Sequence, residues 1–418
     1  MNFGRSLAPF RHRRFALLWC GAFVSNIGTW METVGVGILV TSTTGKAGWT
    51  GLVAAAGFVP QAVLAPVAGA LADRVPRRTL LLTTTSVQMV FAGLLAFLTS
   101  IGTPGPGVVT VIVFGAGCAS ALGFPAYQAM LPDLVPTRDL PGAIALSSAQ
   151  WNLGRVIGPA LAGIVIGLGG YELAFTINAL SFFAVLAVLA SFTLPPPAHH
   201  GDVSIVESVR EGARFVRGNP ALRFVVESLA LNSLLAAPFI ALIPAVALKL
   251  FHEEKLGTSV LVTAQGVGAV CMALSLAWYF SRFGARRTLL VMLGLLPVAL
   301  LAYALAPTLG FAAIVILGVG YLYMGCLSSF TTIAQLVAPP ELRGRVVSVL
   351  MMLLGALYPL GAVLQGAIAD EIGLRPTTAG AAILLGLSFG LRMVARPHSA
   401  DALAAVGTGP SAGLPESE

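Results

Sequence analysis

Charged residues are scarce in this sequence. Asp, Glu, Lys and Arg make up 10% of the 418 residues, whereas a soluble domain has about 25%. Hydrophobic residues make up 57%, and the mean hydropathy is +0.89. A chain with so little charge cannot cover a water-facing surface, which excludes a soluble enzyme, a nucleic-acid-binding protein and a disordered chain. The composition predicts a protein that crosses the membrane many times.

Sequence motifs for several kinds of chemistry are also absent. The four cysteines all fall inside apolar runs, so we expect no disulfide, and no Cys/His cluster has the spacing of a metal site. No GxxxxGK[ST] string for ATP binding occurs, and neither GxSxG nor HExxH is present. We therefore predict that the protein is not an enzyme, has no catalytic residues, and uses no cofactor or metal.

Twelve apolar segments follow one another along the chain, each about as long as a membrane-spanning helix of ~20 residues. One long polar break separates six segments from six. We predict a first six-helix bundle at residues 1–194, a linker at 195–222, a second bundle at 223–397 and a disordered tail at 398–418. The segments are residues 16–42, 50–72, 79–101, 107–130, 142–168, 171–193, 223–250, 258–281, 287–306, 310–336, 345–369 and 376–394.

The basic residues are unevenly distributed between the two sides of these segments. If the N-terminus is cytoplasmic, nearly all arginines fall in cytoplasmic segments, and the outer side holds only Lys46, Lys249, Lys255 and Arg375. Cytoplasmic loops carry an excess of Lys and Arg, so we predict that both termini and the linker face the cytoplasm. The net charge of +7 has the same explanation and does not indicate a nucleic-acid partner.

The two halves also resemble each other in sequence. The string Arg-Arg-Thr-Leu-Leu at residues 77–81 recurs at 286–290, between the second and third segments of each half. Residues 134–142 and 336–344 form a second related pair, between the fourth and fifth segments. Internal repeats of this kind place a substrate site near the midplane, between the halves. We therefore predict two pseudo-symmetric bundles with a site between them.

The most specific motif ends the second segment and reads Gly69-Ala70-Leu71-Ala72-Asp73-Arg74-Val75-Pro76-Arg77-Arg78. It resembles the signature loop of the major facilitator superfamily, with proline where a glycine is usual. The resemblance implies the twelve-helix major facilitator fold. A small Gly69 permits close approach of helices, and Asp73 can accept hydrogen bonds from loop arginines or a neighbouring helix end. We interpret Gly69, Asp73, Arg74, Arg77 and Arg78 as a conformational latch; the alternative is a basic loop that only sets topology.

Two further regions resemble a narrower subgroup of that superfamily. Residues 10–31 and 211–220 are similar to enterobactin-exporter-like and macrolide-efflux-like transporters, which implies a secondary exporter, commonly driven by proton exchange. The fifth segment contains a string similar to the antiporter motif GxxxGPxxGG, formed here by Gly154, Gly158, Pro159 and Gly163. In the superfamily, this motif is associated with export. Small residues at this spacing also serve ordinary helix packing, which is the alternative interpretation.

Two charged residues fall deep inside the predicted spans. Glu32 lies about 22 Å along the first segment and Arg155 about 20 Å along the fifth, so their depths are similar. Each is costly within a bilayer and needs a partner or a wet cavity. Because the two segments are neighbours in the superfamily fold, we expect Glu32 and Arg155 to face each other. Glu32 is then either the proton-coupling carboxylate or one member of a permanent structural ion pair.

Uncharged polar and aromatic residues also occur inside the spans. They suggest a roomy, weakly charged cavity suited to a bulky hydrophobic or amphipathic molecule, although each residue taken alone has a structural explanation. The candidates for the cavity lining are Asn26, Thr29, Tyr127, Asn152, Asn232, Gln265, Tyr321 and Tyr358.

We therefore predict a monomeric, multi-pass major facilitator transporter of a bacterial inner membrane. It would export a drug-like or siderophore-like small molecule by proton antiport with alternating access. Its expected partners are the small-molecule substrate, protons and the lipid bilayer. The alternative is an uptake symporter or facilitator for a small metabolite on the same fold.

Overall fold

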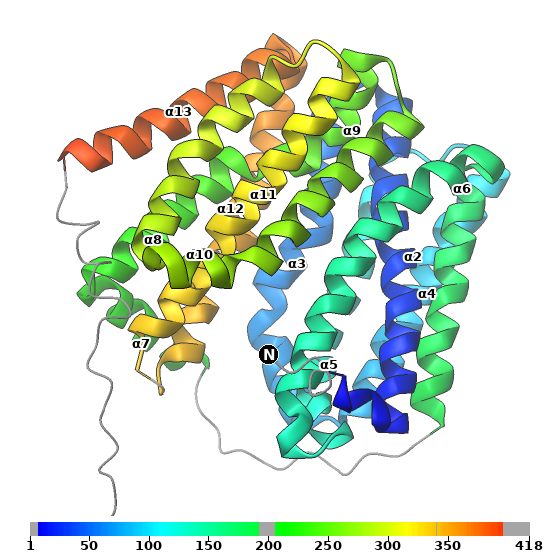
Figure 1. Cartoon of the computed structure of the whole chain (residues 1–418). Coiled ribbons are helices and arrows are strands. Elements are labelled where there is room, and N and C mark those ends of the chain that lie inside the picture. The colour runs from blue at the N-terminus through cyan, green and yellow to red at the C-terminus, as the bar shows by residue number, and fades with distance from the viewer. Residues whose placement is uncertain (1–6, 192–204, 340, 396–418) are drawn as a thin grey trace, which may run out of the picture.

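The regular elements are all helices in the computed structural model, which describes residues 7–191, 205–339 and 341–395 (Figure 1). Ten helices of this described part are long and apolar enough to cross a membrane. This confirms the prediction of an all-helical membrane protein. The predicted tail at 398–418 and the start of the predicted linker lie outside the described residues.

The helices of the first half are α2 (Arg13–Thr44), α3 (Ala47–Arg74), α4 (Arg77–Ile101), α5 (Pro106–Leu134) and α6 (Leu140–Ala190), with short turns η1 (Ala8–Arg11) and η2 (Thr137–Asp139). A separate helix, α7 (Ile205–Gly218), precedes the second half. The second half consists of α8 (Pro220–Leu231), η3 (Asn232–Ala236), α9 (Pro238–Phe251), α10 (Lys255–Ala304), α11 (Leu309–Val337), α12 (Arg343–Ile372) and α13 (Leu374–Ala395).

Two helices are too long for a single crossing. A straight helix of the 51 residues of α6 or the 50 of α10 would measure about 75 Å, more than twice the roughly 30 Å hydrocarbon core. Each breaks at a glycine with positive φ, 71° at Gly170 and 77° at Gly284, a conformation that glycine adopts without strain. The chain reverses at these breaks (Figure 1). Each long helix therefore contains two of the twelve predicted segments.

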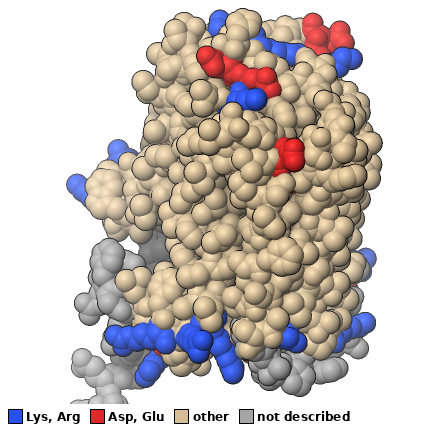
Figure 2. All heavy atoms as spheres, turned by 90° about the vertical axis from the view of Figure 1, so that its right-hand side faces the viewer, with Lys and Arg blue, Asp and Glu red and all other residues tan. Residues whose placement is uncertain are grey.

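The molecule has two chemically different ends. We call the end that holds η1, η2 and α7 the linker end, and the opposite end, where α3 begins and α12 ends, the far end (Figure 1). On the face shown in Figure 2, Lys and Arg gather along the linker end, and most of the visible Asp and Glu lie toward the far end.

The halves contact each other most extensively through α3 and α12, which run antiparallel. A Cβ built on Gly51 would lie 2.2 Å from the carbonyl oxygen of Ala362, and one on Gly366 would lie 2.7 Å from that of Ala47. Only glycine permits this approach of backbone to backbone. Both contacts are in the far-end part of the helices, so the halves are packed together there.

Helix α7 packs on the beginning of α12. Glu211 forms an ion pair with Arg345, and a Cβ on Gly212 would lie 2.8 Å from the carbonyl oxygen of Arg345. The linker helix is therefore fastened to the second half at the linker end. Next to it, the side chain of Asn219 caps α8 by accepting the backbone N–H groups of Ala221 and Leu222.

Candidate functional site

Arg155 lies where helices of both halves meet. Its Nη2 donates a hydrogen bond of 3.2 Å to Oε1 of Gln265, which joins α6 of the first half to α10 of the second. Its guanidinium carbon lies 5.7 Å from the ring centre of Trp30 in α2, within the range of a cation–π interaction. It also interacts electrostatically with Tyr323 of α11 and Tyr358 of α12. Five helices thus contribute to the surroundings of one arginine.

Aromatic rings form the remainder of these surroundings. Tyr358 packs edge-on against Phe58 of α3, with ring centres 5.0 Å apart, and this contact crosses between the halves. Tyr323 packs edge-on against Phe239 of α9 at 5.8 Å. The site therefore combines one cationic group with a largely apolar aromatic lining.

The predicted pairing of Glu32 with Arg155 is not formed in this structure. Oε2 of Glu32 accepts a hydrogen bond of 2.6 Å from Nδ2 of Asn178, in the second part of α6. Among the described residues, no ion pair joins Glu32 to Arg155. The expectation took into account only the first part of α6, and the return of that helix brings a neutral partner to Glu32 instead.

The glycines of the antiporter-like motif pack α6 against two neighbours. Cβ atoms built on Gly154 and Gly158 would lie 3.0 Å from Cβ of Asn26 and 2.6 Å from Cβ of Trp30, both in α2. A Cβ on Gly163 would lie 2.6 Å from Oγ of Ser259 in α10. The motif therefore positions Trp30 beside Arg155 and brings the two halves together at the far end. Pro159, which lies inside the helix, is buried.

The residues of the predicted latch belong to the linker end. Nη1 of Arg77 donates to Oδ2 of Asp133 at 2.6 Å, and Nε of Arg78 donates to the carbonyl of Leu189 at 2.7 Å. Both contacts stay within the first half. A Cβ on Gly69 would meet no atom of the described residues within 4 Å, so no described helix approaches closely there in this structure. Arg74 ends α3, and the side chain of Asp73 lies outside the described part.

Two of the eight predicted cavity residues, Gln265 and Tyr358, interact with Arg155 in this structure. Asn26 packs under Gly154, the carbonyl of Thr29 accepts from Thr33, and Nδ2 of Asn152 donates to the carbonyl of Ser148. The hydroxyl of Tyr127 donates to Gln150, and that of Tyr321 donates to Tyr279. Asn232 is buried in η3, a π-helical turn. The place of these six residues in a cavity stays a prediction.

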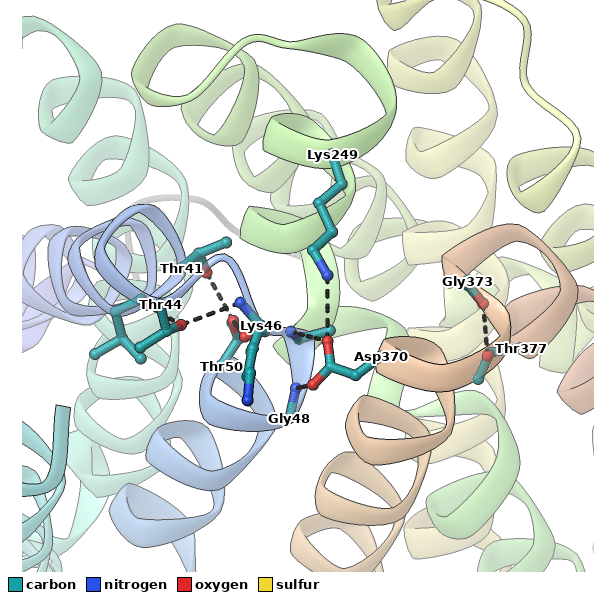
Figure 3. Close-up of polar contacts among 11 residues, drawn as sticks. Thr41, Thr44, Lys46, Gly48, Thr50, Lys249, Asp370, Gly373 and Thr377 are labelled. Atoms are coloured by element: carbon teal, nitrogen blue, oxygen red, sulfur yellow. Dashed lines mark hydrogen bonds and ion pairs between the residues drawn. The ribbon is translucent and has the colours of Figure 1, made fainter.

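Asp370 forms the most developed polar contact between the halves, and the sequence did not single it out (Figure 3). Its two carboxylate oxygens accept the backbone N–H groups of Ala47 and Gly48 at 2.7 and 2.8 Å. Nζ of Lys249 in α9 donates to the same carboxylate at 3.2 Å. The first turn of α3 has no side-chain cap of its own, so a carboxylate of the opposite half supplies one at the positive end of the helix.

A second contact joins the halves at the far end. The hydroxyl of Tyr171, beside the break in α6, donates to Oε1 of Glu254 at 2.7 Å, just before α10 begins. Together with the bonds of Asp370 and Arg155, it accounts for the side-chain hydrogen bonds that join described residues of the two halves. All of them lie between the far end and the middle of the helices.

The sequence of residues 4–412 matches the family described as transmembrane secretion effector. The chain belongs to this family of major facilitator transporters. The transmembrane secretion effector family consists of transporters and not enzymes, which confirms the predicted superfamily and the absence of enzymatic activity.

Several characterised members of the superfamily are similar to this transporter over most of its length. The multidrug efflux pump Tap of Mycolicibacterium fortuitum is 29% identical, over 86% of this chain and 90% of its own. Macrolide efflux protein A of Streptococcus pyogenes is 24% identical over 86% and 90%. The staphyloferrin A transporter of Staphylococcus aureus is 26% identical over 84% and 89%.

Solved structures support the same fold at lower identity. A bacterial homologue of the human lysosomal transporter Spinster, crystallised in an inward-facing and unoccupied conformation, superposes with a TM-score of 0.70 at 16% identity. The match covers 96% of this chain and 98% of that one. The transporter therefore has the major facilitator fold.

Proposed function

We propose that this transporter exports a small hydrophobic or amphipathic molecule across a bacterial inner membrane in exchange for protons. The observation that supports transport through the centre of the molecule best is the position of Arg155, at the junction of five helices from both halves. The similarity to efflux pumps for drugs and macrolides and to a siderophore transporter supports export.

The position of the contacts between the halves supports alternating access. The hydrogen bonds of Asp370, Tyr171 and Arg155 close the far end down to the middle of the helices. We place both termini and the linker in the cytoplasm, because Lys and Arg gather at the linker end. The conformation is then closed toward the outside, and export requires that these bonds break while the linker end closes.

The latch at the linker end belongs to the opposite phase of the cycle. Asp73 lies near the C-terminal end of α3, at the same end of the molecule as the beginning of α12. Because α3 and α12 are antiparallel, Asp73 is placed relative to the beginning of α12 as Asp370 is placed relative to the beginning of α3. In our proposal, Asp73 with Arg74, Arg77 and Arg78 stabilises the state in which the linker end is closed, and Gly69 then permits close packing.

Glu32 is the proton-carrying group in this proposal. It is a carboxyl within a membrane-spanning helix, and its hydrogen-bond partner is the neutral amide of Asn178. Since no cation among the described residues is paired with it, the neutral acid is favoured in this conformation, and in our proposal Glu32 releases its proton when the cycle exposes it to water. A Glu32→Gln variant keeps an acceptor for Asn178 but cannot exchange a proton.

The test uses inverted membrane vesicles with an imposed proton gradient. Accumulation of dyes, macrolides and siderophores is compared between the wild type, Glu32→Gln and Glu371→Gln, the last being a control at an exposed acid of α12. We expect accumulation that requires the gradient, is lost in Glu32→Gln and persists in Glu371→Gln. Accumulation that survives in Glu32→Gln would reduce this residue to a structural role. Uptake in right-side-out vesicles without any accumulation in inverted ones would contradict export.

A further inference from the structure

Arg155 has no counterion among the described residues. A guanidinium group carries five N–H donors and no acceptor, and the structure gives it one hydrogen bond, to the neutral Gln265. A cation within a membrane protein is normally paired with an anion. Glu32, the other charged residue predicted deep inside the spans, is directed to Asn178. The side chain of Arg155 is half-buried.

The neighbours of Arg155 present donors as well. Because the guanidinium only donates, Gln265 turns its oxygen toward it, and its buried Nε2 is left without an acceptor. The indole Nε1 of Trp30 is also buried and without an acceptor. Two buried N–H groups, of Trp30 in α2 and Gln265 in α10, thus have no acceptor among the described residues, and Arg155 of α6 has only one. Such groups are costly when buried, and a ligand rich in acceptors would satisfy them.

The positions of these donors are fixed by the packing of the helices. Gly158 holds the Cβ of Trp30 against α6, since a Cβ at this glycine would lie 2.6 Å from it. Gly266 lets α10 approach the backbone of Arg155, whose carbonyl oxygen would lie 3.3 Å from a Cβ there. The helices that carry these three side chains are thus packed closely before any ligand binds, and Tyr323 and Tyr358 lie near enough to Arg155 to interact with it electrostatically.

We propose that Arg155 binds an anionic group of the transported solute, and that this solute is an amphipathic organic anion, such as a carboxylate on an apolar body. The carboxylate would accept from the guanidinium in bidentate fashion and from the N–H groups of Gln265 and Trp30. The apolar body would lie against the aromatic rings. A solute that carries a cation in place of the anion is disfavoured by the charge of Arg155. This inference rests on the proposed function, since it names the class of solute that the exporter carries.

The experiment measures binding of three probes to the purified full-length transporter at neutral pH; the probes share a pyrene ring on a four-carbon chain and differ in the head group and its charge. The probes are pyrenebutyrate, its uncharged counterpart pyrenebutanol and its cationic counterpart pyrenebutylamine, detected by energy transfer from tryptophan to pyrene. Hydrogen bonds to a charged group correspond to an affinity gain of about tenfold to a hundredfold. We expect pyrenebutyrate to bind more tightly than pyrenebutanol by this factor and pyrenebutylamine to bind most weakly.

Variants then assign the preference to Arg155. Arg155→Gln should bring the affinities for pyrenebutyrate and pyrenebutanol to within about threefold of each other. Arg155→Lys should keep part of the preference for pyrenebutyrate, because lysine retains the charge without the planar guanidinium. Arg138→Gln is the matched control, since the side chain of Arg138 is 83% exposed at the linker end, and it should behave as the wild type. The comparison of the three probes on the wild type needs no variant and stands even if Arg155→Gln fails to fold.

Two results would overturn the inference. One is a wild type that binds pyrenebutanol or pyrenebutylamine as tightly as pyrenebutyrate. The other is a folded Arg155→Gln variant that retains the full preference for the acid. Gradient-driven accumulation of erythromycin that depends on Glu32, without a preference for the acid, would overturn the anion assignment and leave proton-coupled export intact. A preference for the acid without any gradient-driven accumulation would overturn proton-coupled export and leave the anion assignment intact.

Discussion

The carboxylate of Asp370 accepts the backbone N–H of Gly48 at 2.8 Å, so the end of α12 caps the beginning of α3 from the opposite half of the molecule (Figure 3). The same carboxylate binds the N–H of Ala47 and the ammonium of Lys249. Helix N-termini carry a partial positive charge that favours an anion at this position. The contact therefore stabilises specifically the conformation in which the far end is closed.

Asp370→Asn should favour opening of the far end. The variant loses the charge that strengthens these three bonds, worth about 1–2 kcal/mol, which corresponds to a roughly five- to thirtyfold larger open population. The reporter is Ala362→Cys, at a position that is 0% exposed in the interface between α3 and α12, in a background without the four natural cysteines. The rate of labelling by an impermeant maleimide added from outside should rise by this factor. Glu371→Gln is the control on the same helix, and equal labelling rates in the two variants would contradict the prediction.

Two glycines of α3 should respond differently to the same substitution. Gly51→Ala places a Cβ 2.2 Å from the carbonyl of Ala362, and such overpacking costs about 1–3 kcal/mol. Gly69→Ala meets nothing within 4 Å and should leave the stability of this conformation unchanged or slightly raised. The apparent melting temperatures of the purified variants check this difference. Equal melting temperatures for Gly51→Ala and Gly69→Ala would show that α3 and α12 are not packed closely at Gly51.

The sequence predicted the architecture well, because each span must present an apolar surface about 20 residues long to lipid. The glycines that end one span and begin the next, Gly170 and Gly284, are not distinguishable in the sequence from the many glycines inside spans. The predicted segments on either side of each glycine nevertheless fall almost entirely within α6 and α10, which break at Gly170 and Gly284. Hydropathy reports the length of a crossing and gives no information on how helices from the two halves approach each other.

The site was less predictable, since partners depend on helix rotation. Glu32 and Arg155 were recognised as unusual from their depth alone, but the periodicity of each helix did not show that Glu32 turns toward Asn178 and Arg155 toward Gln265. Asp370 lies at the end of a span, where a charged residue is expected from solvation, so its position gave no signal. Its role depends on α3 and α12 lying side by side, which the sequence does not show.

The hydrogen bond between Asn178 and Glu32 should contribute measurably to stability. Asn178 is 1% exposed, and Asn178→Ala would leave the carboxyl of Glu32 without its partner, which costs roughly 1–3 kcal/mol. In the background of Glu32→Ala, Asn178→Ala should lower the free energy of unfolding by less, which gives an interaction energy between the two residues of about 1 kcal/mol. Reversible unfolding in mixed detergent micelles provides the four free energies of this cycle. Additive effects of the two substitutions on the free energy of unfolding would mean that this hydrogen bond is not formed in the purified protein.

The antiporter-like motif should act on binding through Trp30. A Cβ on Gly158 would lie 2.6 Å from Cβ of Trp30 and 2.7 Å from the carbonyl oxygen of Ile27, so Gly158→Ala forces α2 away from α6. The ring centre of Trp30 lies 5.7 Å from the guanidinium carbon of Arg155, so displacement of Trp30 should weaken binding of pyrenebutyrate. The same substitution should also lower the free energy of unfolding by about 1–3 kcal/mol. Gly167→Ala lies on the same helix and meets nothing within 4 Å, which makes it the matched control. Weakened binding in Gly158→Ala but not in Gly167→Ala supports a positioning role for the motif. Loss of stability with unchanged binding would instead separate the packing of α2 and α6 from the site at Arg155.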